Sequence, residues 1–174
     1  MIRLLAICGS LRAVSTNLTL LKAAEMLAPP DVVLTRFDGL GALPHFNPDL
    51  DVDPPPPAVA AFREAVRQAD GLIVSTPEYA RGVPGALKNA LDWLVSSDVF
   101  PDKPVALFNA SDRSVAMQAS LRLTLETMSA RMVDVATITV PLLGQQTDAA
   151  TVAGDLAYGP KIRDALEAYV RFLA

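Results

Sequence analysis

The chain has 174 residues and a formal net charge of −4, and 51% of its residues are hydrophobic. This size and composition predict one compact domain over residues 1–174, and the lack of a basic stripe argues against a nucleic acid or an anionic membrane as partner. The single cysteine excludes an internal disulfide and the N-terminus shows no signal segment, so we expect a cytoplasmic protein.

The first predicted element is a buried strand over residues 2–7, followed by the loop Cys8–Asn17 and a helical pattern from Leu18 to Leu27. At such a junction, free backbone N–H groups and the positive end of the helix dipole face the loop. Arg12 can pair with an anion, and three further side chains of the loop can donate hydrogen bonds without adding negative charge: Ser10, Ser15 and Asn17. The loop therefore predicts a phosphate site, with an ordinary capped turn as the alternative.

Three sharper motifs are absent from this loop. It lacks the Gly-Lys-Ser/Thr ending of a Walker loop, and Gly9 is its only glycine, where a dinucleotide fingerprint has three. A cysteine phosphatase would place its arginine at the position of Val14. We therefore interpret Cys8 as a small buried hydrophobe at the end of the strand.

The second predicted strand, residues 31–37, is more polar and is placed at a sheet edge. The irregular segment 38–53 follows, and its centre, Pro44–Asn47, is either a surface loop or a wall of a ligand site. Four prolines, Pro54–Pro57, then form a stiff entrance to a helix over 58–66 rather than a domain boundary. The third strand, residues 72–76, has the apolar density of a sheet centre.

The loop Pro77–Gly85 combines glycines and prolines with one aromatic residue and leads into a helix over 86–94. Trp93 falls outside the apolar stripe of that helix. It is therefore interpreted either as peripheral core or as an anchor for a partner subunit.

A fourth strand is predicted at 105–109, a last strand at about 132–140 and a last helix at about 161–173. Between them, a helix over about 115–130 has apolar residues on two sides. Ala119 and Leu123 lie on the second side, which suggests dimerisation, with a plain core helix as the alternative.

Five strands that alternate with helices predict an α/β, doubly wound, five-stranded parallel sheet in the order 2-1-3-4-5, with helices on both faces. Ligands bind such sheets beyond the carboxyl ends of the strands, where the order reverses. The loops after strands one, three and four then converge. Phosphate donors in the first loop, backbone amides beside Tyr79 and the hydroxyl of Ser111 suit a mononucleotide such as FMN.

Two motifs carry a family resemblance. Gly-Ser-Leu-Arg-x-x-Ser-x-Asn in the first loop, and Thr76–Tyr79 followed by Val83–Leu94, resemble the NAD(P)H-dependent FMN reductases, a family that includes quinone, chromate and azo reductases. The resemblance implies a flavodoxin-like fold, bound FMN, NADPH or NADH as hydride donor, and homodimers or homotetramers. It also implies these cofactor-binding residues: Ser10, Arg12, Ser15, Asn17, Pro77, Glu78, Tyr79, Ala80, Arg81, Gly82 and Ser111.

The chain departs from the family pattern at two places. Ala80 and Gly82 stand where an asparagine and a serine are usual, and the fourth loop, residues 111–115, is short, lacks glycine and carries Asp112. Both departures lie at the end of the site where the flavin ring, rather than the phosphate, would be bound.

The expected activity is an FMN oxidoreductase that takes a hydride from a nicotinamide and reduces a quinone, flavin or azo compound. No catalytic side chain and no metal is expected, because the cofactor supplies the chemistry. Tyr79 and Arg81 are the candidates for contact with the second substrate. A flavin-binding electron carrier or sensing module, and a domain that no longer holds flavin, are the alternatives.

Overall fold

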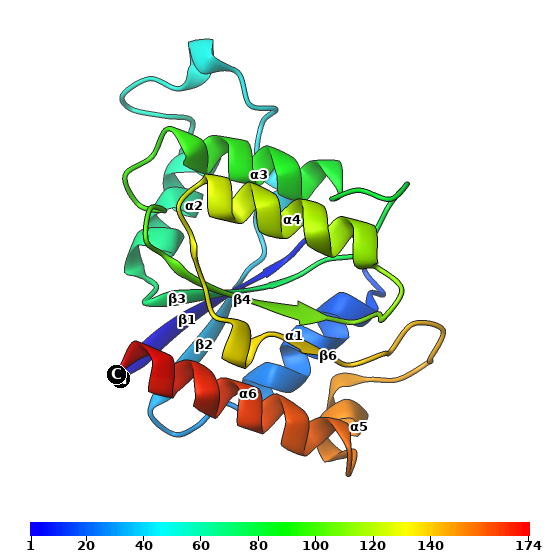
Figure 1. The fold of residues 1–174 in the computed structure, drawn as a ribbon. Coiled ribbons are helices and arrows are strands. Elements are labelled where there is room, and N and C mark those ends of the chain that lie inside the picture. Colours follow the sequence, from blue (N-terminus) through cyan, green and yellow to red (C-terminus); the bar gives the residue numbers. More distant parts are fainter.

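The computed structural model describes residues 1–174 as a parallel sheet with helices on both faces (Figure 1). The strand order is β2-β1-β3-β4-β5, with β6 also paired to β4, and this confirms the predicted topology. The strands are β1 (Ile2–Cys8), β2 (Val32–Phe37), β3 (Gly71–Ser75), β4 (Pro104–Asn109), β5 (Arg131–Met132) and β6 (Ile138–Thr139). As expected, β2 lies at an edge of the sheet.

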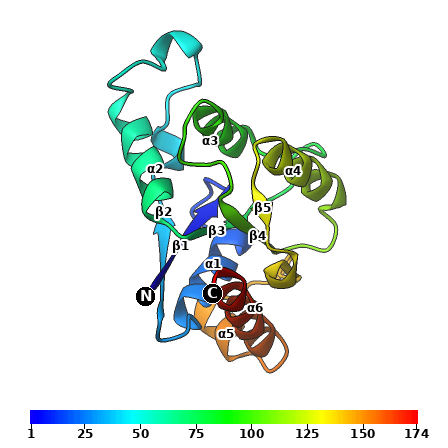
Figure 2. The ribbon, with the colours of Figure 1, turned by 60° about the vertical axis from the view of Figure 1, so that its left-hand side comes forward.

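Six α-helices cover the sheet in two layers. They are α1 (Thr16–Met26), α2 (Pro57–Gln68), α3 (Gly85–Val95), α4 (Val115–Thr127), α5 (Ala149–Gly154) and α6 (Tyr158–Leu173). Figure 1 and Figure 2 show α2, α3 and α4 on one face and α1, α5 and α6 on the other. As predicted, the proline run leads directly into α2.

Alternating side chains of the strands fill two separate cores. On β1, Leu5 and Ile7 join a cluster of 22 buried residues on the α2–α4 face, while Leu4 and Ala6 join a cluster of 20 on the other face. Strands buried on both faces in this way carry near-continuous apolar runs. The two cores hold the strands rigidly, so the loops at their carboxyl ends start from fixed positions.

The prediction of one strand over 132–140 is wrong, because a 3-10 turn, η3 (Asp134–Ala136), divides it into β5 and β6. Both pieces pair with β4, and the extra residues bulge out between them. At the bulge, the hydroxyl of Thr137 accepts the N–H of Leu107 at 3.1 Å, in place of a strand carbonyl. The helix α5 was not predicted, since its six residues are too few to show a period.

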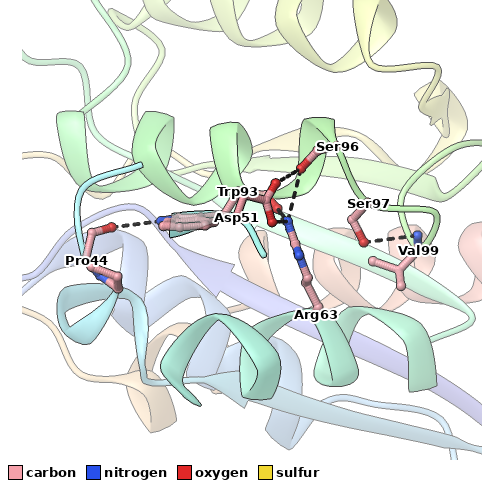
Figure 3. Close-up of polar contacts among 7 residues, drawn as sticks. All are labelled: Pro44, Asp51, Arg63, Trp93, Ser96, Ser97 and Val99. Atoms are coloured by element: carbon pink, nitrogen blue, oxygen red, sulfur yellow. Dashed lines mark hydrogen bonds and ion pairs between the residues drawn. The ribbon is translucent and has the colours of Figure 1, made fainter. Parts of the chain in front are cut away.

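The segment 38–56 is strapped to α3 through Trp93 (Figure 3). The indole N–H of Trp93 donates to the carbonyl of Pro44 at 2.8 Å, and its ring meets Phe46 edge-on at 5.1 Å. Arg63 on α2 donates to the carbonyl of Trp93 and pairs with Asp51 at 2.9 Å. A hydrogen bond from Ser96, helped by the charge of Arg63, holds the pKa of Asp51 below its ordinary value.

Trp93 is fully buried, so its interpretation as core is confirmed and its role as a partner anchor is wrong. Its surroundings also decide between the two interpretations of Pro44–Asn47. Pro44 and Phe46 are held on α3 by hydrogen bonds with Asn89 of 2.9 and 2.7 Å. This loop therefore covers Trp93 instead of forming a wall of the cavity described below.

None of the helices is both long enough and apolar enough to span a membrane.

Candidate functional site

A cavity of about 340 Å³ opens at the carboxyl ends of the strands. In Figure 1, the arrow of β4 points to this end of the sheet. Four loops form it, those that follow β1, β3, β4 and β6. Its lining residues are Ser10, Arg12, Val14, Ser15, Thr16, Asn17, Thr76, Pro77, Glu78, Tyr79, Ala110, Ser111, Ser114, Leu143, Gly144 and Gln145. The structure thus brings eight of the eleven predicted cofactor-binding residues to one cavity.

The first loop presents free hydrogen-bond donors to this cavity. Ser15 is the N-cap of α1, and its hydroxyl accepts the N–H of Leu18 at 3.4 Å. The N–H groups of Thr16 and Asn17, in the first turn, have no acceptor within the protein, and the side chain of Arg12 makes no ion pair. Unsatisfied donors at a helix N-terminus beside a guanidinium are suited to bind a phosphate.

The floor of the cavity joins β1 to β3. The hydroxyl of Ser75 donates to the side-chain oxygen of buried Asn17 at 3.0 Å. The amide NH₂ of Asn17 has no hydrogen-bond acceptor within the protein. Gly9 is required here for close approach, since a Cβ at this position would lie 2.1 Å from the hydroxyl of Thr76. The cavity is therefore built on a rigid junction of two central strands.

Glu78 joins the third loop to the fourth. Its carboxylate accepts the N–H of Met117, in the first turn of α4, at 2.9 Å. No side chain near the start of α4 caps this helix, so Glu78 acts as the cap from a different loop. The carboxylate thereby fixes the spacing between two walls of the cavity.

We expect Glu78→Ala to lower the free energy of unfolding by about 0.5–2 kcal/mol, because a helix N-terminus loses its acceptor. Glu78→Gln keeps an acceptor oxygen and should lose less, about 0.3–1 kcal/mol for the charge alone. Urea denaturation of the three proteins measures both values. Equal losses for the two variants would argue against a cap at this position.

Residues 79–82 form a two-residue hairpin turn at the tip of the third loop. Tyr79 and Gly82 exchange both backbone hydrogen bonds, at 3.1 and 2.9 Å, and Ala80 and Arg81 have φ of 49° and 63°. Positive φ at both central positions defines the mirror-image turn type that asparagine and glycine favour. Ala80, Arg81 and Gly82 therefore lie at the lip, beside Tyr79, and are not among the residues that line the cavity. Their contact with the cofactor stays a prediction.

Because Ala80 is strained in this turn, Ala80→Asn should raise the free energy of unfolding by about 0.5–1 kcal/mol. Asparagine tolerates the left-handed region better than alanine. Thermal unfolding provides the measurement, and Ala86→Asn, on the nearby helix α3, is a control expected to destabilise. A destabilised Ala80→Asn protein would contradict the assigned turn.

Sequence reasoning missed several lining residues, among them buried Ser114 and the segment Leu143–Gln145. The segment follows β6, and its position at the carboxyl end of a parallel strand was the signal that could have found it. Cys8 lies beside the cavity, and burial raises the pKa of its thiol, in keeping with its interpretation as a small hydrophobe.

The parallel sheet in the order 2-1-3-4-5, with a donor-rich cavity where β1 and β3 meet, defines a flavodoxin-like α/β protein with a ligand site at the switch point. A family model described as NADPH-dependent FMN reductase matches residues 2–145. The chain belongs to this family, and the resemblance proposed from the two motifs is confirmed.

Two similar curated proteins are an NAD(P)H-dependent FMN reductase of Pseudomonas aeruginosa and a 2-hydroxy-1,4-benzoquinone reductase of a Burkholderia species. Each is 41% identical, over 112 and 113 residues respectively, or 63% of this chain. The matches span 60% and 61% of the relatives' own length. The chain therefore covers about three-fifths of these relatives.

Among solved structures, a flavoenzyme NAD(P)H:(acceptor) oxidoreductase from Paracoccus denitrificans superposes with a TM-score of 0.79 and 26% identity. The match covers 99% of this chain and 97% of that one. An azoreductase from Bacillus anthracis superposes with a TM-score of 0.60 and 15% identity, and the match covers 99% of this chain and 99% of that one. This similarity shows the shared fold.

Proposed function

We propose that this chain binds FMN in the cavity and is an NAD(P)H-dependent oxidoreductase. The observation that carries the proposal is the set of unpaired donors at the start of α1, which fits the phosphate of FMN. Arg12, Ser10, Ser15 and Asn17 would hold that phosphate. Pro77, Glu78, Tyr79 and Ser111 would border the ring.

When bound, FMN supplies the hydride chemistry, and the side chains of the site hold and orient their ligands. The donors of the first loop fix one end of the cofactor. The hydrogen bond from Met117 to Glu78 holds the third loop against the fourth at the other end. Tyr79, half exposed at the lip, offers its ring to the second substrate.

The proposed reaction passes a hydride from NADPH or NADH to FMN and then two electrons to a small acceptor. The relatives reduce quinones or FMN according to their names, and we propose the same classes, together with azo compounds, for this chain. A titration with FMN, followed by turnover of quinones, free flavin and azo dyes under NADPH, tests the proposal. Binding without turnover of any acceptor would favour an electron carrier.

We further propose a homodimer or homotetramer in which α4 contributes to the contact. Met117, Leu121 and Leu125 face the core, whereas Leu123 is 66% exposed. Val115 and Ala119 precede Leu123 at intervals of four residues and are also exposed, so the three side chains form an apolar stripe along one face of α4.

Leu123→Asp should shift the oligomer toward monomers, because it places a charge in the centre of the stripe. Sedimentation velocity measures the shift, and Arg163→Asp on the opposite layer serves as a control. An unchanged oligomer in Leu123→Asp would remove α4 from the contact. The cytoplasmic compartment and the single domain over residues 1–174 stay predictions.

A further inference from the structure

Two arginines at the lip of the cavity have no partner in the protein. Arg81 lies at the tip of the third loop and Arg113 in the fourth, and both side chains are exposed. Neither makes an ion pair, a side-chain hydrogen bond or a contact with an aromatic ring. Six of the other nine arginines make such a contact, namely Arg36, Arg63, Arg67, Arg122, Arg131 and Arg171, whereas Arg3, Arg12 and Arg163 make none.

The backbone of Arg81 adds a second observation. Its φ of 63° lies in the left-handed region, which disfavours a long side chain. No contact of its own guanidinium compensates for that strain. Backbone strain of this kind gathers at ligand-binding segments, where the surrounding structure enforces it. The turn thus fixes the backbone of Arg81, whose side chain is unpaired, beside Tyr79.

The two loops are also held close together. They follow β3 and β4, which are hydrogen-bonded neighbours in the sheet, and the bond from Glu78 to Met117 joins them again above it. The N–H of Arg113 donates to the hydroxyl of Ser111 at 3.1 Å, which orders the fourth loop. Both cations are therefore anchored by residues that line the cavity.

The lip has the opposite charge to the protein as a whole. Its loops carry Arg12, Arg81 and Arg113 against Glu78 and Asp112, although the chain has a net charge of −4. The carboxylate of Glu78 is occupied at the start of α4. Besides Arg12, the cations that an anionic ligand would meet at the mouth of the cavity are therefore Arg81 and Arg113.

The identity of the anion rests on the proposed function. With Arg12 assigned to the FMN phosphate, two guanidinium groups remain for the second ligand. A simple quinone is neutral and gains nothing from them. A nicotinamide nucleotide that delivers its hydride at this mouth carries a diphosphate one ribose away from its reactive ring, and arginine binds phosphate oxygens in a two-pronged manner.

We propose that Arg81 and Arg113 form the binding site for the diphosphate of the hydride donor. The 2′-phosphate of NADPH is not needed for this contact, since NADH and NADPH share the diphosphate. The pair would strengthen donor binding without touching the hydride transfer itself.

The test compares two donors on the FMN-loaded protein. NADPH carries the diphosphate, whereas 1-methyl-1,4-dihydronicotinamide delivers the same hydride without any phosphate. For Arg81→Ala/Arg113→Ala we expect the second-order rate constant of anaerobic flavin reduction to fall at least about tenfold with NADPH and to stay unchanged with the methyl compound. The dissociation constant of NADP⁺ should rise by a similar factor.

Arg163→Ala is the matched control, because Arg163 is an exposed arginine on α6 without an ion pair. Equal loss for the two donors, or a loss as large in the control, would overturn the proposal. A loss with NADPH and not with NADH would also overturn it, because the 2′-phosphate would then be the contact. If the chain holds no flavin, the proposed function fails, while NADP⁺ binding to wild type and double variant still tests the pair.

Discussion

Arg12→Ala is expected to weaken FMN binding by about 1.5–3 kcal/mol, or roughly 10- to 150-fold in dissociation constant. The reason is that the variant would lose the charge-assisted, two-pronged contact that we propose between Arg12 and the phosphate at the start of α1. Quenching of FMN fluorescence on titration with the protein measures the constant. The stability of the chain should hardly change, because the side chain of Arg12 is exposed and has no partner in the protein.

Two further variants sharpen this result. Arg12→Lys retains the charge and loses the fork, so its affinity should fall between those of wild type and Arg12→Ala. Arg163→Ala makes the same change of charge on α6 and should leave the affinity unaltered. Unchanged affinity in Arg12→Ala would remove this residue from the site.

Trp93→Ala is expected to lower the free energy of unfolding by about 3–5 kcal/mol, the largest effect on stability predicted for this chain. Trp93 is fully buried, and the substitution leaves a cavity between α3 and the segment that covers it. The N–H of its ring also holds the carbonyl of Pro44 at 2.8 Å. Urea unfolding, followed by circular dichroism, provides the measurement.

Trp93→Phe separates packing from the hydrogen bond. The carbonyl of Pro44 still accepts from Asn89 at 2.9 Å, so this variant should lose only about 1–2 kcal/mol. Val95→Ala, two residues along α3 and 65% exposed, should stay within about 0.5 kcal/mol of wild type. A Trp93→Ala protein as stable as Val95→Ala would show that the strap contributes nothing.

The sheet could be predicted because its strands carry short apolar runs between clear loop signals, and parallel connections leave few topologies. The division of the last strand could not, since β-branched residues flank Asp134 on both sides, and Asp134 is the only charged residue from Met132 to Val140. The break depends on a side chain, the hydroxyl of Thr137, that replaces a backbone acceptor. The burial of Trp93 was also hard to predict, because the residue lies outside the apolar stripe of α3. The segment before α2 folds back and buries it.

At the site, the donor-rich end of the cavity could be predicted from the first loop, because capping residues and free donors are local features. The other end could not be read in this way. Whether Glu78 faces a ligand or a helix depends on the start of α4, and the place of Arg81 depends on a turn that its sequence, Ala-Arg, does not favour. The positions of Glu78 and Arg81 therefore depend on contacts between and within loops, which the local sequence does not reveal.

Anaerobic addition of NADPH to the purified, FMN-saturated protein tests directly whether the chain is an FMN-dependent reductase. We expect the protein to bind one FMN per chain, and we expect its flavin absorbance near the visible maximum to bleach rapidly and to return when a quinone is added. A protein that stays yellow with both NADPH and NADH, or one that binds no FMN, would contradict it.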